Sequence, residues 1–308
     1  MTGHKEKIIA SGLGFVEGPV ALADSSLLFV EIDSQTVKKL QPDGGIELIC
    51  TTGGGPNGLA IGPNNYLFIC NNGGFSWRHE HGMTLPKPAV EPRDYSGGRI
   101  EKYAFDNKLL EVIYTGTKDG PLNGPNDIVF DSDGGFWFTD LGKSRDATAD
   151  RGSVYYAKAD GSYIERVLHP LITPNGIGLS PDGRSLYVAE SWTSRLWRFD
   201  ITEPGKIDRK EWPSPNGGEL VYGAPGYQIF DSLAVEENGN ICVGSLHEGC
   251  ISVISPEGNL VEAVKCPDPF PTNICFDRNS PSTAYITLSG AGKVMKRHWA
   301  RDGLKLQF

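Results

Sequence analysis

The 308-residue sequence lacks several features that mark common classes of protein. It has no run of Lys and Arg, and its net charge is −9, which argues against binding to nucleic acid or to an anionic membrane surface. No stretch is long and apolar enough to span a bilayer, and residues 1–10 lack the apolar core of a signal peptide. We therefore expect a soluble, cytoplasmic protein.

Two common kinds of site are also missing. The sequence has no G-x-S-x-G motif, which argues against a Ser-His-Asp hydrolase. Its cysteines form no C-x-x-C pair, so the spacing of a zinc cluster is absent, and we expect buried free thiols in a cytosolic protein. The six cysteines are Cys50, Cys70, Cys242, Cys250, Cys266 and Cys275.

Helical periodicity is absent as well, and a sixfold repeat takes its place. Each unit opens with a polar residue, followed by a short apolar strand, a turn such as Ser180-Pro181-Asp182-Gly183, and further apolar runs. Four antiparallel strands in each of six units predict an all-β fold, a six-bladed β-propeller that spans residues 1–308 as one domain. The six leading residues are Glu17, Asn57, Asn126, Asn175, Asp231 and Thr272.

The spacing of the units locates an insertion. The second and third units start 69 residues apart (57 to 126), against 40 to 56 elsewhere. We place the extra residues, 71–97, between the second and third strands of the second blade and expect them to form a lid over the axis. The ring of blades closes, in this prediction, with residues 7–10 beside the last blade, although residues 304–308 compete for that edge.

The leading residues predict a metal site. The first strand of a blade is the innermost one, so all six residues lie near the central channel on one face. Carboxylates held close together repel unless a cation or a proton intervenes. Because the set contains only oxygen donors, a hard divalent cation is favoured, Ca²⁺ before Mg²⁺ or Mn²⁺, with Zn²⁺ or Fe²⁺ further alternatives. The predicted ligands are Glu17, Asn126, Asn175 and Asp231.

Each of these fragments also has an ordinary explanation when taken alone. Asn-Gly, at Asn57 and Asn175, is typical of a hairpin turn, and Glu17-Gly18-Pro19 of a strand start. The repeat favours the metal site, because matched positions of successive blades meet in space whereas unrelated turns need not.

With these residues identified, the chain resembles the gluconolactonase and regucalcin-like (SMP-30/gluconolactonase/LRE) family of propeller lactonases. The resemblance rests on Val16-Glu17-Gly18-Pro19, Pro125-Asn126-Asp127, Pro174-Asn175-Gly176 and Phe230-Asp231-Ser232, and it spans nearly the whole chain. A more distant likeness extends to the paraoxonase and diisopropyl fluorophosphatase propellers.

The resemblance implies roles for single residues. Glu17, Asn175 and Asp231 match metal ligands of the family, Asn126 matches a residue that binds the metal or the substrate, and Asp231 also matches the proposed general base. Members that act on sugar-acid lactones often have Arg two residues before the Asn-Asp pair, and Gly124 stands there in this chain.

These observations predict a metal-dependent hydrolase that opens a lactone. A divalent cation would polarise the lactone carbonyl, and Asp231 or, as the second candidate, Asp127 would accept a proton from water. A purely electrostatic role for Asp231 is the alternative. Substrate contacts are expected from Asn57 and Asn126, and from Trp77 and His79 of the insertion. A non-catalytic propeller that binds Ca²⁺ or a protein, and a strictosidine-synthase-like enzyme, are the competing functions.

Overall fold

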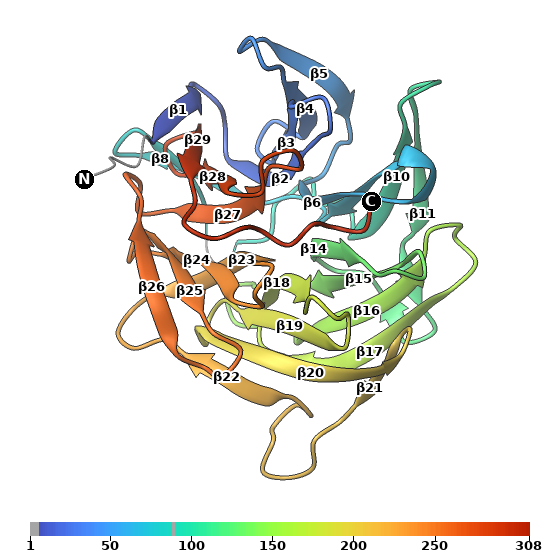
Figure 1. Cartoon of the computed structure of the whole chain (residues 1–308). Helices are drawn as coiled ribbons and strands as arrows, with labels where there is room; N and C mark the ends of the chain where they lie inside the picture. The colour runs from blue at the N-terminus through green and yellow to red at the C-terminus, as the bar shows by residue number, and fades with distance from the viewer. Residues whose placement is uncertain (1–5, 88–89) are drawn as a thin grey trace.

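The protein is a six-bladed β-propeller, as predicted. The computed structural model describes residues 6–87 and 90–308, so two positions of the predicted insertion lie outside the described residues. Within the described part, the regular structure consists of strands and one short 3₁₀ turn, η1 (Pro63–Asn65). Six antiparallel sheets are arranged as blades around a central axis (Figure 1).

The first three blades follow the chain in order. Blade one contains β2 (Val16–Ala21), β3 (Leu27–Glu31), β4 (Thr36–Leu40) and β5 (Ile46–Thr51). Blade two contains β6 (Pro56–Ile61), β7 (Leu67–Asn71), β10 (Arg99–Ala104) and β11 (Leu109–Tyr114). Blade three contains β14 (Pro125–Phe130), β15 (Gly135–Asp140), β16 (Gly152–Lys158) and β17 (Ile164–Leu171).

Blade four is the broadest of the six. It contains β18 (Pro174–Leu179), β19 (Ser185–Glu190), β20 (Arg195–Glu203) and β21 (Lys206–Asp208), and an additional strand, β22 (Glu219–Gly223), also pairs with β20. Blade five contains β23 (Ile229–Val235), β24 (Ile241–Leu246), β25 (Cys250–Ile254) and β26 (Leu260–Lys265). The sequence repeat did not predict the additional strand.

The last blade closes the ring with strands from both ends of the chain. Its order is β27 (Pro271–Phe276), β28 (Thr283–Leu288), β29 (Lys293–His298) and then β1 (Lys7–Ala10), which pairs antiparallel with β29. The predicted closure by residues 7–10 is therefore confirmed. The competing residues 304–308 form no strand and pass toward the middle of the face seen in Figure 1, where Phe308 packs against Phe130.

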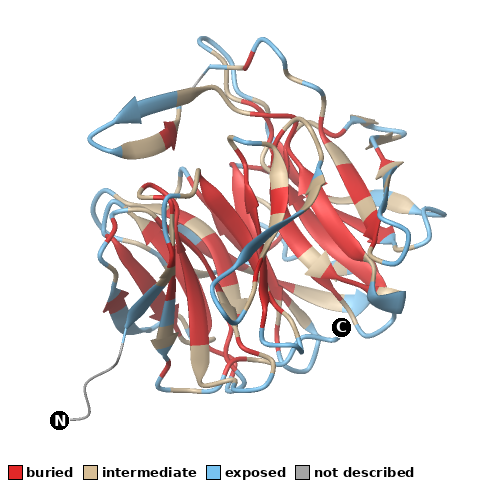
Figure 2. Cartoon of the chain, turned by 90° about the horizontal axis from the view of Figure 1, so that it is seen from above, coloured by how far each residue is buried: buried red, intermediate tan, exposed pale blue. Residues whose placement is uncertain are grey.

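The hydrophobic core lies between neighbouring blades, which pack face to face. Between blades three and four, for example, Trp137 and Val154 pack with Ile177, Val188 and Trp197. Figure 2 shows the buried residues concentrated in the strands inside the disc, with exposed residues at its two faces. Burial of apolar surface between blades stabilises each sheet against its neighbours and fixes the central axis on which the first strands meet.

Two small hairpins are added to the blades. Strands β12 (Gly116–Thr117) and β13 (Gly120–Pro121) pair in the link between blades two and three. Strands β8 (Trp77–Glu80) and β9 (Met83–Pro86) form a hairpin between β7 and β10, so the insertion lies where it was predicted. In Figure 2 this hairpin projects from one face of the disc, whereas the C-terminus is marked toward the other.

Candidate active site on the propeller axis

Five of the six polar leading residues stand outside the regular strand ladders, and the sixth, Glu17, pairs with Val30 directly before a shift in register. In blade three, Pro125 pairs with Asp140 and Ile128 with Phe138, so the register shifts across Asn126 and Asp127. The pairing of first and second strands shifts at the corresponding place in the other five blades. Such bulges redirect side chains and are common next to active sites. The bulges thus release the leading residues from the sheets toward the axis.

Glycine brings the first strands of neighbouring blades into close contact. A Cβ on Gly18 would lie 2.3 Å from the carbonyl oxygen of Asn57, and one on Gly58 would lie 2.5 Å from that of Asn126. A Cβ on Gly176 would lie 2.7 Å from the carbonyl oxygen of Asp231. Any larger residue would push the strands apart, so these glycines allow the leading residues to gather in one ring.

Glu17 is buried within this ring. Its Oε2 accepts hydrogen bonds from Asn273 Nδ2 and from its neighbour's backbone, Gly18 N, both at 2.8 Å. Asn273 belongs to the blade at the opposite end of the sequence, so this contact crosses the closure of the propeller. Asn273 follows the leading residue Thr272 in the repeat, and sequence analysis did not single it out.

Hydroxyl groups of second and first strands orient the neighbouring residues. Thr139 Oγ1 donates to the carbonyl oxygen of Asn175 at 2.6 Å and accepts from the backbone N–H of Asp127 at 3.1 Å. Asn175 Nδ2 donates to Ser191 Oγ at 3.1 Å, and Ser232 Oγ donates to Asn175 Oδ1 at 3.4 Å. Sequence analysis missed these hydroxyls because they lie outside the leading positions.

Three carboxyl groups, those of Glu17, Asp127 and Asp231, converge in this ring. Desolvation raises the pKa of Asp127 to about 8, and the negative charge of Glu17 adds to the rise. Desolvation and then Glu17 also raise the pKa of Asp231 well above its usual range, although Asn175 and Ser232 donate hydrogen bonds to it. Desolvation raises the pKa of Glu17 too. The mutual influence of the three acids shows that the fold brings them together.

The leading residues differ in their burial and in their hydrogen bonding. Asn126 is buried, and within the described part of the chain its Oδ1 has no hydrogen-bond partner. Asn57 is buried next to Gly18, whereas Thr272 is bonded within a cluster of hydroxyls that includes Thr287 at 2.9 Å. Asp231 is half-buried, whereas the other five leading residues are buried.

The donor set fits a divalent cation. A buried amide oxygen without a partner and carboxylates that repel one another are both stabilised by a positive ion, and oxygen donors suit Ca²⁺. Over residues 6–87 and 90–308, no group of three or more His, Cys, Asp and Glu side chains has the arrangement of a metal site. Two of the four predicted ligands, Asn126 and Asn175, are amides and would bind the ion through their carbonyl oxygens.

The insertion begins beside this ring and crosses the same face of the propeller. Thr84 N donates to the carbonyl oxygen of Gly290, between β28 and β29, at 3.1 Å. The half-buried ring of Trp77 packs against Phe15 with its centroid 5.4 Å away. His79 is exposed, and its Nδ1 lies 3.2 Å from Thr84 Oγ1 within the hairpin. Their predicted contact with a substrate stays a prediction.

A lysine of blade three binds the base of the insertion. Lys143 follows β15 and is buried, and its Nζ donates to the carbonyl oxygen of Gly74 at 2.8 Å. The ammonium group also lies 4.5 Å from the ring centroid of Phe75 and 5.1 Å from that of Tyr95. Cation–π contacts of this kind strengthen when they are desolvated. Sequence analysis did not predict this attachment, because Lys143 is far from the insertion in the chain.

Gly124 has a structural reason to be glycine. A Cβ at this position would lie 2.7 Å from the carbonyl oxygen of Gly142, and the Gly124 N–H donates to buried Asp140 at 2.7 Å. An arginine would require the link between β15 and β16 to move. The absence of the arginine therefore follows from close backbone packing before Asn126.

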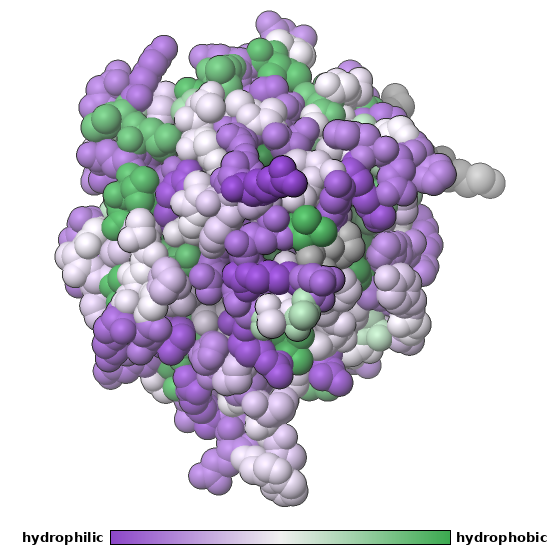
Figure 3. Space-filling model, turned by 180° about the vertical axis from the view of Figure 1, so that it is seen from behind, coloured by the Kyte–Doolittle hydropathy of each residue, from purple (hydrophilic) through white to green (hydrophobic). Residues whose placement is uncertain are grey.

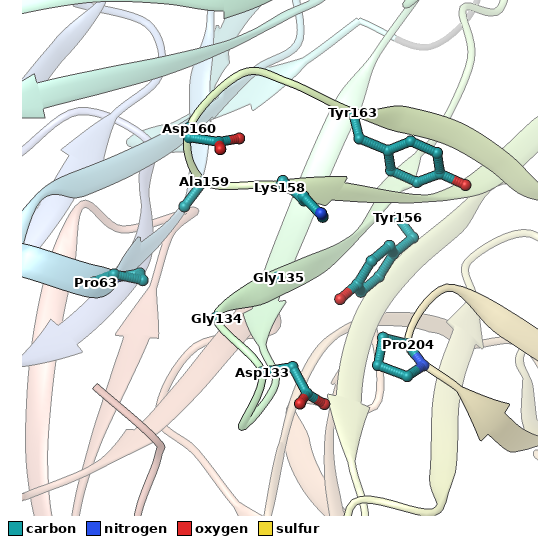
Figure 4. Close-up of a pocket in the computed structure, with 10 residues that line it drawn as sticks. All are labelled: Pro63, Asp133, Gly134, Gly135, Tyr156, Lys158, Ala159, Asp160, Tyr163 and Pro204. Atoms are coloured by element: carbon teal, nitrogen blue, oxygen red, sulfur yellow. The ribbon is translucent and has the colours of Figure 1, made fainter.

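The two faces of the propeller carry different surface features. A hollow of about 710 Å³ is lined by turns at the opposite ends of the blades, with Asp133 and Asp160 at its two ends and Tyr156 and Lys158 between them (Figure 4). No predicted site residue lines it. Seen from behind, the face with the β8–β9 hairpin is largely hydrophilic, with apolar groups in small separate patches (Figure 3).

The similarity of this chain to known proteins shows its family. A family profile described as the SMP-30/Gluconolactonase/LRE-like region matches residues 15–290. The chain belongs to this family. The matched range extends over all six leading residues and the whole insertion.

Relatives within and near the SMP-30/gluconolactonase/LRE-like family support this assignment. A Staphylococcus saprophyticus lactonase, drp35, is 28% identical over 255 residues, which cover 82% of this chain and 70% of the relative. The diisopropyl-fluorophosphatase of Loligo vulgaris is 30% identical over 212 residues, which cover 65% of each chain, slightly less than two thirds. Regucalcin from Agrobacterium tumefaciens, a calcium-binding protein, shares the fold with a TM-score of 0.75 at 17% identity, covering 98% of this chain and 95% of regucalcin.

Two further predictions can be compared with the structure. All six cysteines are free thiols, as expected, but only Cys70, Cys242 and Cys250 are buried, and the other three are half-buried. Across residues 6–87 and 90–308 no helix has the length and apolar character needed to cross a membrane.

Proposed function

We propose that this protein is a metal-dependent hydrolase that opens the ring of a lactone at the axial site. The observation that supports it best is the ring itself, where Glu17, Asp127 and Asp231 repel one another beside the unpartnered Oδ1 of Asn126. The related drp35 proteins are lactonases, which supports lactone hydrolysis as the reaction.

The proposed ion is Ca²⁺, held by Glu17, Asn126, Asn175 and Asp231. Regucalcin, which has the same fold, is a calcium-binding protein, and the oxygen donors of the ring match this cation. A divalent ion in the ring would polarise the carbonyl of the lactone and offset the negative charge that develops on its oxygen. The remaining steps depend on the side chains.

Asp231 is the proposed general base. It retains accessible surface, whereas Asp127 is buried, so Asp231 is better placed to accept a proton from the attacking water. Hydroxide oxygen adds to the carbonyl carbon, the ester C–O bond breaks, and the ring oxygen takes up a proton to give a hydroxy acid. Asp127, with its pKa near 8 in the absence of an ion, is the second candidate.

The proposed contacts with the substrate come from two parts of the molecule, the axial ring and the insertion. Asn57 and Asn126 would contact the lactone from the ring, and Trp77 and His79 from the insertion. Because Gly124 packs tightly against Gly142, an arginine contact to a sugar hydroxyl is not part of this proposal.

The test is elemental analysis of the purified protein combined with a panel of lactones in a pH-indicator assay, with and without chelator. We expect acid release that chelator abolishes and added Ca²⁺ restores. Hydrolysis that survives exhaustive dialysis against chelator contradicts metal dependence. Bound Ca²⁺ without turnover of any lactone favours the alternative, a non-catalytic calcium-binding propeller.

The general base is tested with two matched substitutions, Asp231→Asn and Asp127→Asn. Asp231→Asn should lose turnover, and Asp127→Asn should keep a larger part of it. If Asp127→Asn binds the metal but loses activity while Asp231→Asn retains measurable turnover, the base is Asp127.

A further inference from the structure

Among the described residues, a few buried polar side-chain atoms lack a hydrogen-bond partner. In the described part of the chain there are four such side-chain atoms, and two of them, Glu91 Oε2 and Arg198 Nε, belong to ion pairs with Arg145 and Asp200. The other two are Asn126 Oδ1 and Asn72 Nδ2. One is an acceptor and the other a donor, and they belong to neighbouring blades.

The amide of Asn72 has a fixed orientation. Its Oδ1 accepts a hydrogen bond from Gly74 N at 2.8 Å, so the other atom, Nδ2, is the nitrogen and carries the free N–H groups. The carbonyl oxygen of Gly74 is in turn held by Lys143 Nζ at 2.8 Å. Gly74 is thus fixed at both its N–H and its C=O, and it holds the Asn72 amide in one rotation.

Asn72 lies beside the chain that leads into the axial ring. Its backbone N–H donates to the carbonyl oxygen of Gly55 at 2.8 Å, and its neighbour Asn71 pairs with Pro56, the residue before Asn57. A Cβ on Gly55 would lie 2.3 Å from Asn72 Oδ1, so the side chain packs directly against this segment. Asn72 is therefore at the root of the insertion and at the edge of the ring.

The neighbouring Asn71 provides a contrast within the same strand end. Its Nδ2 donates to the carbonyl oxygen of Gly53 at 2.8 Å and to Glu101 Oε2 at 3.0 Å, and its Oδ1 accepts from Gly55 N at 2.8 Å. Both ends of the Asn71 amide are used inside the protein, which identifies a structural residue. Asn72 uses only its acceptor, and a buried donor without a partner destabilises the folded protein.

We propose that Asn72 is a substrate-binding residue whose Nδ2 donates a hydrogen bond to an oxygen atom of the bound lactone. This inference rests on the proposed function and extends it to a residue outside the leading positions. The oxygens of an ester can only accept hydrogen bonds, so a fixed N–H donor is complementary to them. An ionised carboxylate of the ring is also only an acceptor and cannot bind them in this way. The insertion contributes by fixing this donor through Gly74 and Lys143.

The test uses Asn72→Asp, with Asn71→Asp as the matched control. Aspartate keeps the acceptor for Gly74 N and replaces the donor by an oxygen. Binding is measured by calorimetry with the lactam whose ring matches the best lactone of the panel, or with δ-valerolactam if no lactone is hydrolysed. A lactam keeps the carbonyl oxygen and resists hydrolysis. Melting temperature and calcium content are measured for every variant.

We expect Asn72→Asp to weaken lactam binding and to lower kcat/KM, each about tenfold or more, with a smaller fall in melting temperature than in Asn71→Asp and with unchanged calcium content. Asn71→Asp should lower the melting temperature and leave lactam affinity within about twofold. Lactam affinity within twofold of wild type in Asn72→Asp, or a fall in its melting temperature as large as in Asn71→Asp, overturns the inference.

The same experiment separates the inference from the proposed function. If wild type binds the lactam through Asn72 but hydrolyses no lactone, the inference stands and the hydrolase proposal fails. If wild type hydrolyses lactones and Asn72→Asp does so equally well, the hydrolase proposal stands and the inference fails. A wild-type protein that neither hydrolyses a lactone nor binds the lactam contradicts both.

Discussion

Strand β23 places one carboxylate at each end, in two opposite environments. Asp231 lies near the start of the strand on the axial ring, and Glu236 directly follows its last residue, Val235. Glu236 is fully buried, while Asp231 retains some accessible surface. The two acids are only five positions apart, so the differences between them come from their partners.

Glu236 is saturated by partners from the C-terminal part of the chain. Arg301 Nε donates to its two oxygens at 2.8 and 2.6 Å, Trp299 Nε1 donates at 2.6 Å and Asn240 Nδ2 at 2.8 Å. Burial alone would raise the pKa of Glu236, but these hydrogen bonds and the charge of Arg301 outweigh it and lower the pKa. This carboxylate fixes the C-terminal segment to blade five.

Asp231 is influenced by two acids and by two groups that donate hydrogen bonds to it. Desolvation and the negative charges of Glu17 and Asp127 raise its pKa, and hydrogen bonds from Asn175 and Ser232 only partly oppose them. The comparison shows that the fold can neutralise a buried acid where structure requires it. The mutual repulsion of the acids in the ring is opposed by hydrogen bonds alone, which lowers stability.

The largest expected effect is on activity, at the Asp231 end of the strand. Asp231→Asn removes one ligand and the proposed base, so lactone hydrolysis should fall by about a thousandfold, and Glu17→Gln should act in the same direction. In chelator, neither substitution should lower the melting temperature, because each removes a repelling charge. Initial rates and thermal melts measure both; wild-type turnover in either variant contradicts the role of the ring.

The opposite result is expected at the Glu236 end. Glu236→Ala leaves Arg301 and Trp299 without their acceptor, and the free energy of unfolding should fall by about 3–5 kcal/mol. Turnover per folded molecule should stay near that of wild type. Chemical denaturation measures the stability, and reaction rates divided by the concentration of folded protein measure the turnover. Loss of activity without loss of stability would contradict the proposed difference between Asp231 and Glu236.

A smaller effect is expected from the hairpin of the insertion. Trp77→Ala or His79→Ala should change the preference between sugar-acid and apolar lactones by about 1–3 kcal/mol in kcat/KM, the size of one lost pocket contact. Trp77 packs on Phe15 and should have the larger effect, and exposed His79 is its matched control on the same strand. An unchanged ranking of lactones in both variants means that the hairpin does not select the substrate.

The smallest effect concerns the attachment of the insertion and depends on pH. Desolvation lowers the pKa of Lys143 to about 8 from an ordinary value of 10.5, although Asp140, Glu91 and Asp150 oppose this shift and Arg145 adds to it. Between pH 8 and 10.5 the unfolded chain binds a proton at this lysine that the folded protein does not.

The stability of wild type should therefore rise with pH across that window relative to Lys143→Met, by about 1–2 kcal/mol. Below pH 8 the lysine is charged in both states, so the difference between the two proteins should be constant there. Denaturation curves at several pH values from 7 to 10 measure it. Parallel pH profiles for the two proteins would show that Lys143 titrates normally.

The sequence predicts the fold well because the repeat is visible residue by residue. Leading residues such as Asn126 and Asn175, followed by apolar strands and turns, recur at each blade and give the blade count, the insertion and the innermost strands. Closure by residues 7–10 followed from the same strand pattern. The additional strand β22 was missed because it lies outside the repeat.

The candidate site was predicted only in part, since its details depend on contacts between distant segments. The leading positions identify the acids of the ring, but bulges at each first strand decide where Asn126 and Asp127 lie. The orientation of Asn72 depends on Gly74 and on Lys143, which is 69 residues further along the chain. No local pattern in the sequence predicts such a contact.

The most direct test of a calcium site on the axis is a titration of metal-free protein with Ca²⁺, followed by calorimetry and by the melting temperature. Wild type should bind one ion per chain and gain about 2.7 kcal/mol of stability at a hundredfold excess over Kd, whereas Asp231→Asn should lose most of this gain and Glu236→Gln should keep it. Equal stabilisation of wild type and Asp231→Asn, or none in wild type, would contradict a metal ion held by the axial ring.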